Sequence, residues 1–554
     1  MGKNVLRLYP WHAIHKRGSD GKIMSAHVNL DALIRREDFD ETDIPGRSPG
    51  SRKDKLSIND FVRGEYFFSG LRKPDFQRET SEWDAKKILN LVESFLAGDL
   101  IPAIILWLSK DNLTFVIDGS HRLSALAAWV NDDYGDGEIS KQFFDGIIPE
   151  EQIEIAAASR KLINKKIGPY SDHKLATTHP DKVSAEIVSR SKKLATLAIQ
   201  VQWVEGDSKN AENSFRKINE QGVPINSTEK KILQSRRKPM GIASRAVIRS
   251  GKGHNYWSKF QPDIQAKLQD LACNINTLLF IPKFKNPIST LDLPMAGKIY
   301  SAGALPLIWD YIRIVNPPNK LGSDGLEIDD PDGNGTLGFL GECKKIAEIL
   351  NSDDQSSLGL HPIVYVYSES GRHKPASFYA ITDLVLELEK KKSFEKFIYA
   401  RKDFEALLLA NDYVIQQIVR QYRSAIGSYQ QIKEFYLACI EKLNAKVPVE
   451  NVIEEINKTP QFNFLTKQPE VELPSPDKQD FSRAVKSRTY IKTALQSVPR
   501  CAICGGFVHT NSVSIDHKTD KKHGGDASAQ NAQVTHPYCN SAKDKLVKLG
   551  LPRS

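Results

Sequence analysis

The sequence has no apolar run long enough for a membrane helix, since no stretch approaches ~20 consecutive apolar residues. The first residues also lack an apolar segment followed by small residues, which is the pattern of a secretory signal. Hydrophobic residues make up 40% of the chain and charged residues 26%, as in folded soluble proteins. We therefore expect a cytoplasmic protein that does not bind membranes.

Cysteine is scarce as well, and the six cysteines do not form a disulfide framework. Three are isolated in the sequence, and we expect them to be small buried residues: Cys273, Cys343 and Cys439. The other three lie close together: Cys501, Cys504 and Cys539. In a reducing compartment such a cluster favours metal ligands over disulfides.

Acidic residues are few in the last part of the chain. Residues 481–554 contain twelve Lys or Arg and four Asp, so +8 of the formal net charge of +9 lies there. Because Lys and Arg displace counterions from nucleic-acid phosphates, this distribution favours DNA as a partner. A solvated basic tail is the alternative.

The length predicts several domains, because 554 residues exceed the ~100 to 200 of a typical domain. We expect an α+β multidomain protein with an N-terminal extension (1–55), an α/β domain (56–235), a mainly helical domain (236–457), a proline-containing linker (458–480) and a small C-terminal domain (481–554). In the α/β domain, the apolar patterns predict strands over 103–109, 113–119 and 194–204. Helices are predicted over 82–98, 120–130 and 211–220, followed by a turn at 221–224.

Two pairs of soft ligands stand in the C-terminal domain, Cys501-x-x-Cys504 and His536-x-x-Cys539. A two-residue gap lets both side chains of a pair reach one tetrahedral Zn²⁺. The four residues therefore predict a structural zinc site.

Between and after these pairs the chain carries a further set of polar residues. Asp516-His517 ends a β-type run, a Gly-rich loop follows at 521–528, and Asn531 comes next. Pro537 suits the first turn of a helix that carries Asn540 and Lys543 one turn apart.

This arrangement resembles the HNH family of ββα-metal nucleases, whose pattern is roughly C..C, DH, GG, N, C..CN..K, over some fifty residues. The resemblance implies that His517 is the general base, and that Asp516 and Asn540 hold one catalytic Mg²⁺ or Mn²⁺. Asn531 would fix the loop and orient the base. We also expect Lys518 and Lys543 to contact DNA.

Some details depart from the family pattern. His536 stands where the family more often has cysteine, and Asn540 where it often has histidine. Adjacent Asp516 and His517 would point to opposite faces of a regular strand, so both can serve only if the strand ends there. The nearby His509 and His523 are expected to be surface histidines.

A second constellation lies in the α/β domain. Asp118-Gly119 ends a predicted strand and a helix follows at once, so free N–H groups at the helix start face the place where an anion would bind. Arg122, in the first turn, could hold a phosphate by a forked contact. The structural alternative is that Asp118 caps the helix and Arg122 pairs with a carboxylate of the fold.

Residues 118–122, which we call the box, follow Phe76-Gln77-Arg78 and Trp83 in the chain. This set resembles the ParB-like domain with a DGQQR box that occurs in GmrSD-type restriction enzymes. The resemblance implies an NTP-binding domain that regulates the nuclease and responds to modified DNA. The site would be lined by Gln77, Arg78, Asp118, Gly119, His121 and Arg122. The box here reads DGSHR, with Ser120 and His121 in place of two glutamines, which affects hydrolysis more than binding.

Together these features predict an NTP-regulated DNA endonuclease that nicks or cuts foreign DNA in an anti-phage, modification-dependent restriction system. An oligomer is compatible with the sequence. Two alternatives stay open: a zinc ribbon that only binds DNA as a regulator, and a DNase toxin directed at the host. A binding ribbon has no use for Asp516, His517 and Asn540 in register, which favours cleavage.

Overall fold

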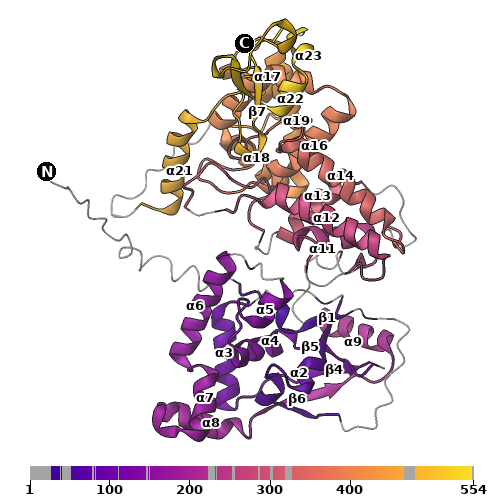
Figure 1. The fold of residues 1–554 in the computed structure, drawn as a ribbon, viewed down its shortest axis with the longest axis vertical. Coiled ribbons are helices and arrows are strands. Elements are labelled where there is room, and N and C mark those ends of the chain that lie inside the picture. The colour runs from indigo at the N-terminus through magenta and orange to yellow at the C-terminus, as the bar shows by residue number, and fades with distance from the viewer. Residues whose placement is uncertain are drawn as a thin grey trace, which may run out of the picture. The chain divides into compact units, whose positions relative to one another are not determined.

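A computed structural model of the chain describes residues 27–37, 39, 52–75, 77, 80, 83–109, 111–144, 148, 150–221, 231, 234–252, 256–284, 287–299, 304–317, 327–466, 481–548 and 550–551. The chain divides into two compact units, Met1–Arg236 with Lys252–Tyr256, and Arg237–Gly251 with Trp257–Ser554. Figure 1 draws both units and labels most of their elements. No helix among the described residues is long and apolar enough to cross a membrane.

The first unit is built on a six-stranded mixed sheet of order β1-β3-β5-β4-β6-β2. In chain order its strands are β1 (Arg35–Glu37), β2 (Lys55–Ser57), β3 (Leu71–Pro74), β4 (Ile104–Leu108), β5 (Thr114–Asp118) and β6 (Ala198–Trp203). β1, β3 and β5 run parallel, β4 is antiparallel to β5 and parallel to β6, and β2 is antiparallel to β6. The carboxyl ends of β3 and β5 therefore lie at the same edge of the sheet.

Helices cover both faces of this sheet. Successive side chains of a strand point to opposite faces, and apolar residues of β5 therefore need a covering helix on each face. Val116 packs in one core with Ile88 of α3, whereas Phe115 packs in the other core with Phe215 of α9. The helices are α2 (Tyr66–Gly70), α3 (Ala85–Ala97), α4 (Ser120–Asn131), α5 (Glu138–Phe143), α6 (Glu150–Lys166), α7 (Tyr170–Thr178), α8 (Ala185–Leu194) and α9 (Ser208–Gln221). The predicted strands and helices of this domain are thus confirmed, while residues 222–224 of the predicted turn lie outside the described residues.

The second unit begins with a helical part, which we define as residues 237–466. Its helices are α11 (Pro239–Ile248), α12 (Pro262–Phe280), α13 (Ala304–Val315), α14 (Asn334–Leu350), α15 (Pro362–Tyr365), α16 (Pro375–Lys390), α17 (Phe394–Ala410), α18 (Asp412–Tyr422), α19 (Ala425–Asn444) and α20 (Val449–Asn457). Cys343 and Cys439 are buried as expected, but the prediction was wrong for Cys273, which is exposed.

The first residues of the expected linker, which the helical part includes, pack against α19. Phe462 and Leu465 are buried, and the ring of Phe462 lies 5.8 Å from that of Phe435. Residues 467–480 lie outside the described residues. The prolines of this segment predicted an extended chain, and that prediction was wrong for its first residues. Burial removes the apolar side chains of Phe462 and Leu465 from water, and this stabilises their packing on the helices.

The same unit also contains the C-terminal module, which we define as residues 501–548, and the helix α21 (Arg483–Ala494) before it. The elements of the module are β7 (Ser514–His517), β8 (Ala532–Thr535), α22 (Pro537–Ser541) and α23 (Lys543–Lys548). β7 and β8 form an antiparallel hairpin in which Asp516 lies opposite Gln533. Tyr538 joins the module to the helical part, since its N–H donates to Ser357 O at 3.0 Å and its hydroxyl to Glu395 at 3.0 Å.

Candidate functional sites

The four predicted zinc ligands converge in the buried interior of the C-terminal module. One ligand atom from each of Cys501, Cys504, His536 and Cys539 lies within 4.8 Å of all the others. His536 Nδ1 is 3.4 Å from Cys504 Sγ and 3.8 Å from Cys539 Sγ. Tetrahedral zinc, with bonds of about 2.0 to 2.3 Å, needs ligand atoms at about these separations. The donor set and its spacing fit a zinc ion.

The orientation of His536 also suits a metal ligand. Its Nε2 lies 3.0 Å from the carbonyl oxygen of Phe507 and donates to it, so Nδ1 keeps its lone pair toward the sulfurs. Hydrogen bonds with Cys504 and Cys539 lower the pKa of the Cys501 thiol, whereas burial raises that of Cys504 to about 12 and hydrogen bonds with Cys501 and Cys504 raise that of Cys539. Without a metal the cluster therefore favours one thiolate, and a metal ion would have to displace the other two thiol protons.

Asp516 and Asn540 lie on the same face of the hairpin. Ser514 and Asp516 share a face because they are two residues apart on β7. Asn540 of α22 donates from Nδ2 to Ser514 Oγ at 2.8 Å, and the buried Asp516 accepts from Gln533 Nε2 at 2.8 Å. The hairpin and the helix thus bring a carboxylate and a carboxamide together.

His517 is the last residue of β7 and is half-buried. Strand alternation directs its ring away from the face that carries Asp516, while its carbonyl oxygen accepts from Lys543 Nζ at 2.6 Å. His517 still pairs with Ala532 in the β7–β8 ladder, so the strand does not end before it, and the joint action of the Asp-His pair stays a prediction.

Asn531 closes the loop that follows the Asp-His pair. Its Oδ1 accepts from Thr519 N at 2.7 Å, and its Nδ2 donates to Thr519 O at 3.1 Å and Asp526 O at 2.7 Å. A Cβ on Gly525 would lie 1.7 Å from Thr519 O, so only glycine fits in this loop. Asn531 is therefore where a loop-fixing residue would stand.

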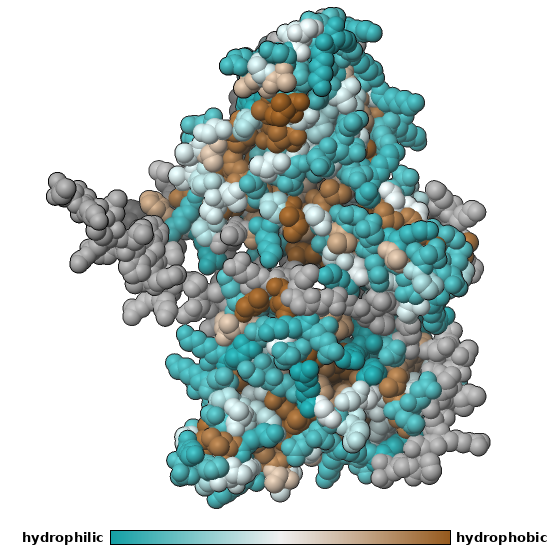
Figure 2. Space-filling view, viewed as in Figure 1, coloured by the Kyte–Doolittle hydropathy of each residue, from teal (hydrophilic) through white to brown (hydrophobic). Residues whose placement is uncertain are grey.

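The two lysines expected to contact DNA have different environments. Lys518 is exposed. Figure 2 shows the surface at the top of the view, where Figure 1 marks the C-terminus, as mainly hydrophilic. Lys543 is nearly buried, and its Nζ contacts Asp516 Oδ2 at 2.9 Å and Asp520 Oδ1 at 3.1 Å. Burial alone would lower the pKa of Lys543, but these two carboxylates raise it above its ordinary value. The ammonium is committed inside the module, so this geometry does not fit the expected DNA contact.

His509 is not the surface histidine that we expected. It is 1% exposed, its ring packs against that of His361, and its Nδ1 lies 2.9 Å from Asn351 Nδ2. Burial lowers the pKa of His509 to about 4. The prediction was wrong because the partners come from the helical part, far away in sequence. His523 is exposed, as predicted.

In the first unit, part of the expected nucleotide site gathers at one sheet edge. Gln77 follows β3 and Asp118 ends β5, and these two parallel strands end at the same edge. Gln77 is buried, and its Oε1 has no hydrogen-bond partner within the described structure. Gly119 has a φ of +99°, and a Cβ there would lie 2.4 Å from Ile104 Cδ1, so the turn requires glycine. Arg78 lies outside the described residues.

The side chains at the start of α4 bond within the protein. Arg122 donates to the Asp118 carboxylate and to the carbonyl oxygens of Pro102 and Ala103. The His121 ring stacks on Trp83, with centroids 5.9 Å apart. The Arg122–Asp118 pair is the contact that the structural alternative describes.

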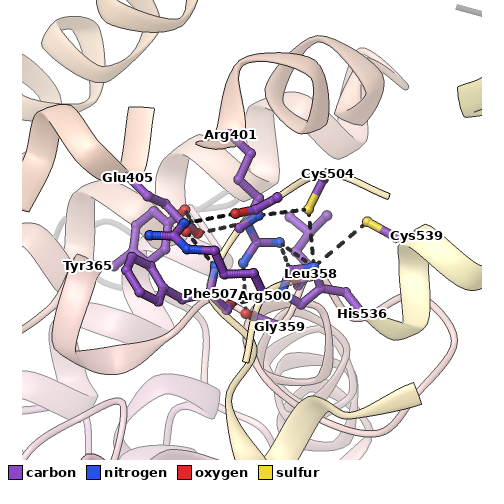
Figure 3. Close-up of polar contacts among 12 residues, drawn as sticks. Leu358, Gly359, Tyr365, Arg401, Glu405, Arg500, Cys504, Phe507, His536 and Cys539 are labelled. Atoms are coloured by element: carbon purple, nitrogen blue, oxygen red, sulfur yellow. Dashed lines mark hydrogen bonds and ion pairs between the residues drawn. The ribbon is translucent and has the colours of Figure 1, made fainter. Parts of the chain in front are cut away.

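Sequence reasoning missed a buried ion pair, Arg401 and Glu405 of α17, beside the four predicted zinc ligands. Figure 3 draws this pair with the ligands Cys504, His536 and Cys539. No local signal marks it, because an Arg and a Glu four positions apart on a helix are usually a surface pair.

Two known families match parts of the chain. Residues 58–235 match the family described as the GmrSD restriction endonuclease, N-terminal domain. Residues 501–546 match the family described as HNH endonuclease. No curated protein and no solved structure is similar enough to the chain to count as a match. The chain thus joins a GmrSD-type N-terminal domain to an HNH endonuclease domain, a combination that supports a restriction endonuclease of a defence system.

Proposed function

We propose that this chain is a metal-dependent DNA endonuclease of a restriction system, in which a nucleoside triphosphate bound to the first unit regulates cleavage by the C-terminal module. The target is foreign DNA, and base modification decides whether it is cut. The HNH match supports hydrolysis of DNA, and the GmrSD match supports a role in restriction. We place this activity in the cytoplasm, where foreign DNA and nucleotides are both available.

The chemistry would rest on the hairpin and its helix. His517 takes the proton from the attacking water, because an imidazole exchanges protons near neutral pH. Asp516 and Asn540 would hold Mg²⁺ or Mn²⁺ through oxygen atoms. When bound, the divalent ion stabilises the charge on the scissile phosphate and the leaving oxygen. Asn531 keeps the loop closed beside His517.

Lys543 already pairs with the carboxylate that would hold the divalent ion. Its ammonium contacts the carboxylates of Asp516 and Asp520, so these two acids converge on positive charge. A metal ion at Asp516 would share this carboxylate with Lys543 or replace it. We therefore assign Lys543 a positioning role, and leave Lys518 and the other exposed basic residues to contact DNA phosphates.

The nucleotide would bind at the sheet edge formed by β3 and β5. The unpartnered Oε1 of buried Gln77 is a hydrogen-bond acceptor that a ligand would satisfy. Gly119 makes the turn into α4, and His121 and Arg122 stand in the first turn of that helix. A phosphate would compete with Asp118 for the Arg122 guanidinium, and Arg78 would complete the site.

The observation that best supports the cleavage proposal is the hairpin with α22 packed on it, which puts Asp516 and Asn540 on one face, with His517 next to Asp516 in the chain. The test is plasmid cleavage by the full chain with Mg²⁺ or Mn²⁺, on unmodified and modified DNA, with and without each nucleoside triphosphate. We expect His517→Ala to lose cleavage by at least about 100-fold, since a general base contributes about 10² to 10⁴ in rate. His523→Ala, which removes an exposed histidine of the following loop, is the matched control and should cut like the wild type.

Zinc content and thermal unfolding of both variants should equal those of the wild type. If His517→Ala cuts as fast as His523→Ala, the assigned base is wrong. If the wild type binds DNA and never cuts it, the zinc-ribbon regulator is the better description. Toxicity on expression without phage would favour the host-directed toxin.

A further inference from the structure

The C-terminal module is joined to the helical part through a buried ion pair. Arg401 and Glu405 stand one turn apart on α17, both side chains are 0% exposed, and Arg401 Nε donates to Glu405 Oε1 at 2.8 Å. A buried pair is costly unless its remaining hydrogen-bonding capacity is met. Here that capacity is met by the carbonyl oxygens of Leu358 and Gly359, by the Tyr365 hydroxyl, and by the N–H of Phe507.

These partners come from both sides of the contact. Leu358, Gly359 and Tyr365 belong to the helical part, whereas Phe507 belongs to the C-terminal module and donates its N–H to Glu405 Oε2 at 2.7 Å. The carbonyl of the same Phe507 accepts from His536 Nε2 at 3.0 Å. A single residue thus connects the buried glutamate with the ring of a metal ligand.

Arg401 reaches the metal cluster directly. Its Nη1 lies 3.2 Å from His536 Nδ1, the atom that faces the cysteine sulfurs, as Figure 3 shows. With a metal bound, that lone pair would go to the metal, and the guanidinium would act through its charge. Three thiolates, one neutral imidazole and one Zn²⁺ sum to a charge of −1, which a cation at this distance stabilises in a buried site. Arginine stays charged there.

Two glycines let the surfaces approach this closely. A Cβ on Gly359 would lie 2.7 Å from His536 Cδ2, and a Cβ on Gly506 would lie 2.4 Å from Arg401 Nε. A side chain at position 359 would separate the backbone of the helical part from His536. A side chain at position 506 would separate the turn after Cys504 from Arg401. The contact therefore depends on backbone from both partners.

We propose that Arg401 and Glu405 of the helical part form the outer shell of the zinc cluster in the C-terminal module, so that zinc binding and docking of the module on α17 are one coupled event. The two are positioning residues. Arg401 stabilises the charge of the cluster, and Glu405 holds Phe507, which in turn fixes the tautomer of His536. This inference does not depend on whether the module cleaves DNA.

The first test measures zinc affinity of the full chain by competition with a chromophoric chelator. Arg401→Met removes the positive charge and the hydrogen-bond donors of the guanidinium. Its matched control is Lys402→Met, which removes the exposed positive charge of the next residue. We expect Arg401→Met to weaken zinc binding by about 10- to 100-fold, the range for outer-shell partners of metal ligands, with Lys402→Met unchanged. Arg401→Lys, which keeps the charge, should fall between them. Equal affinities of Arg401→Met and Lys402→Met would overturn the proposal.

A second test needs no variant and so remains decisive if Arg401→Met does not fold. Hydrogen exchange is followed in the wild-type full chain with zinc and after zinc removal by a chelator. We expect the backbone N–H groups of residues 401–405 of α17 to lose protection together with the N–H of Phe507. If zinc removal deprotects only the C-terminal module and leaves α17 unchanged, the two events are not coupled.

Discussion

The two candidate sites of this chain differ in what their polar atoms do without a ligand. In the C-terminal module, four donor atoms point at one another, while the outer contacts of His536 and Arg401 are already bonded. In the first unit, Arg122 already uses its donors on Asp118 and two carbonyl oxygens. The first arrangement fits a metal ion at its centre, whereas in the second Arg122 is already paired and Gln77 Oε1 lacks a hydrogen-bond partner among the described residues.

This difference has an energetic meaning. A metal that enters the Cys/His cluster gains bonds and breaks few protein contacts, so its binding adds directly to the free energy of folding. A phosphate that takes Arg122 must first replace an ion pair, so only the difference between the two contacts contributes to nucleotide affinity. We expect the metal to be structural and the nucleotide to be exchangeable.

The largest effect should follow removal of a cluster ligand. Cys539→Ser should reduce bound zinc from one per chain to almost none and unfold the C-terminal module, because structural zinc contributes about 10 to 16 kcal/mol in small zinc-folded peptides. Cys343→Ser, at a buried cysteine outside the cluster, should keep its zinc and lose only about 1 to 3 kcal/mol for a buried hydroxyl. Metal analysis and thermal unfolding of the purified full chain measure both. A full zinc complement in Cys539→Ser would remove that residue from the ligand set.

The parts that the sequence predicts well depend on local patterns. β4, β5 and α4 follow from short β-rich apolar runs and a glycine turn, and the Cys/His pairs follow from a two-residue spacing that suits a tetrahedral ion. Asp516 and Asn540 share a face of the hairpin because the hairpin and the helix are both short-range elements. Local sequence therefore suffices to place these two residues, whereas their catalytic roles stay predictions.

The parts that the sequence does not predict depend on distant contacts. Arg401 and His536 are 135 positions apart, and His509 is buried by Asn351, 158 positions away. Lys543 looked like a surface cation, but Asp516 and Asp520 bury its ammonium. In each case the residue type indicated exposure, and only the packing of one part on another changes it.

An intermediate effect should come from the loop that Asn531 closes, where two adjacent glycines offer a matched pair. A Cβ on Gly525 would meet Thr519 O at 1.7 Å, whereas a Cβ on Gly524 has no atom within 4 Å, although its φ of +84° is strained for alanine. We expect Gly525→Ala to open the loop and lower DNA cleavage at least tenfold. Gly524→Ala should cost about 1 kcal/mol of stability and leave cleavage within a factor of about two.

The measurements are cleavage rate at saturating Mg²⁺ and thermal unfolding, with zinc content as the check on folding. Equal rates for the two variants would mean that loop closure by Asn531 does not matter for cleavage. The loop would then be a surface feature of the module, and the organised part of the site would shrink to the metal cluster.

The smallest effect, and the sharpest for the comparison, concerns Arg122. Arg190 is its natural control, because it also pairs with an acid four residues away, Glu186, and also donates to two backbone carbonyl oxygens in the same unit. Both pairs are partly exposed, so Arg122→Ala and Arg190→Ala should each cost only about 0.5 to 1 kcal/mol of stability. If the box binds nucleotide, Arg122→Ala alone should weaken ATP or GTP binding by about tenfold, measured by calorimetry on the full chain. Equal affinities in both variants would reduce Arg122 to what its present contacts describe, a residue that joins the end of β5 to the start of α4.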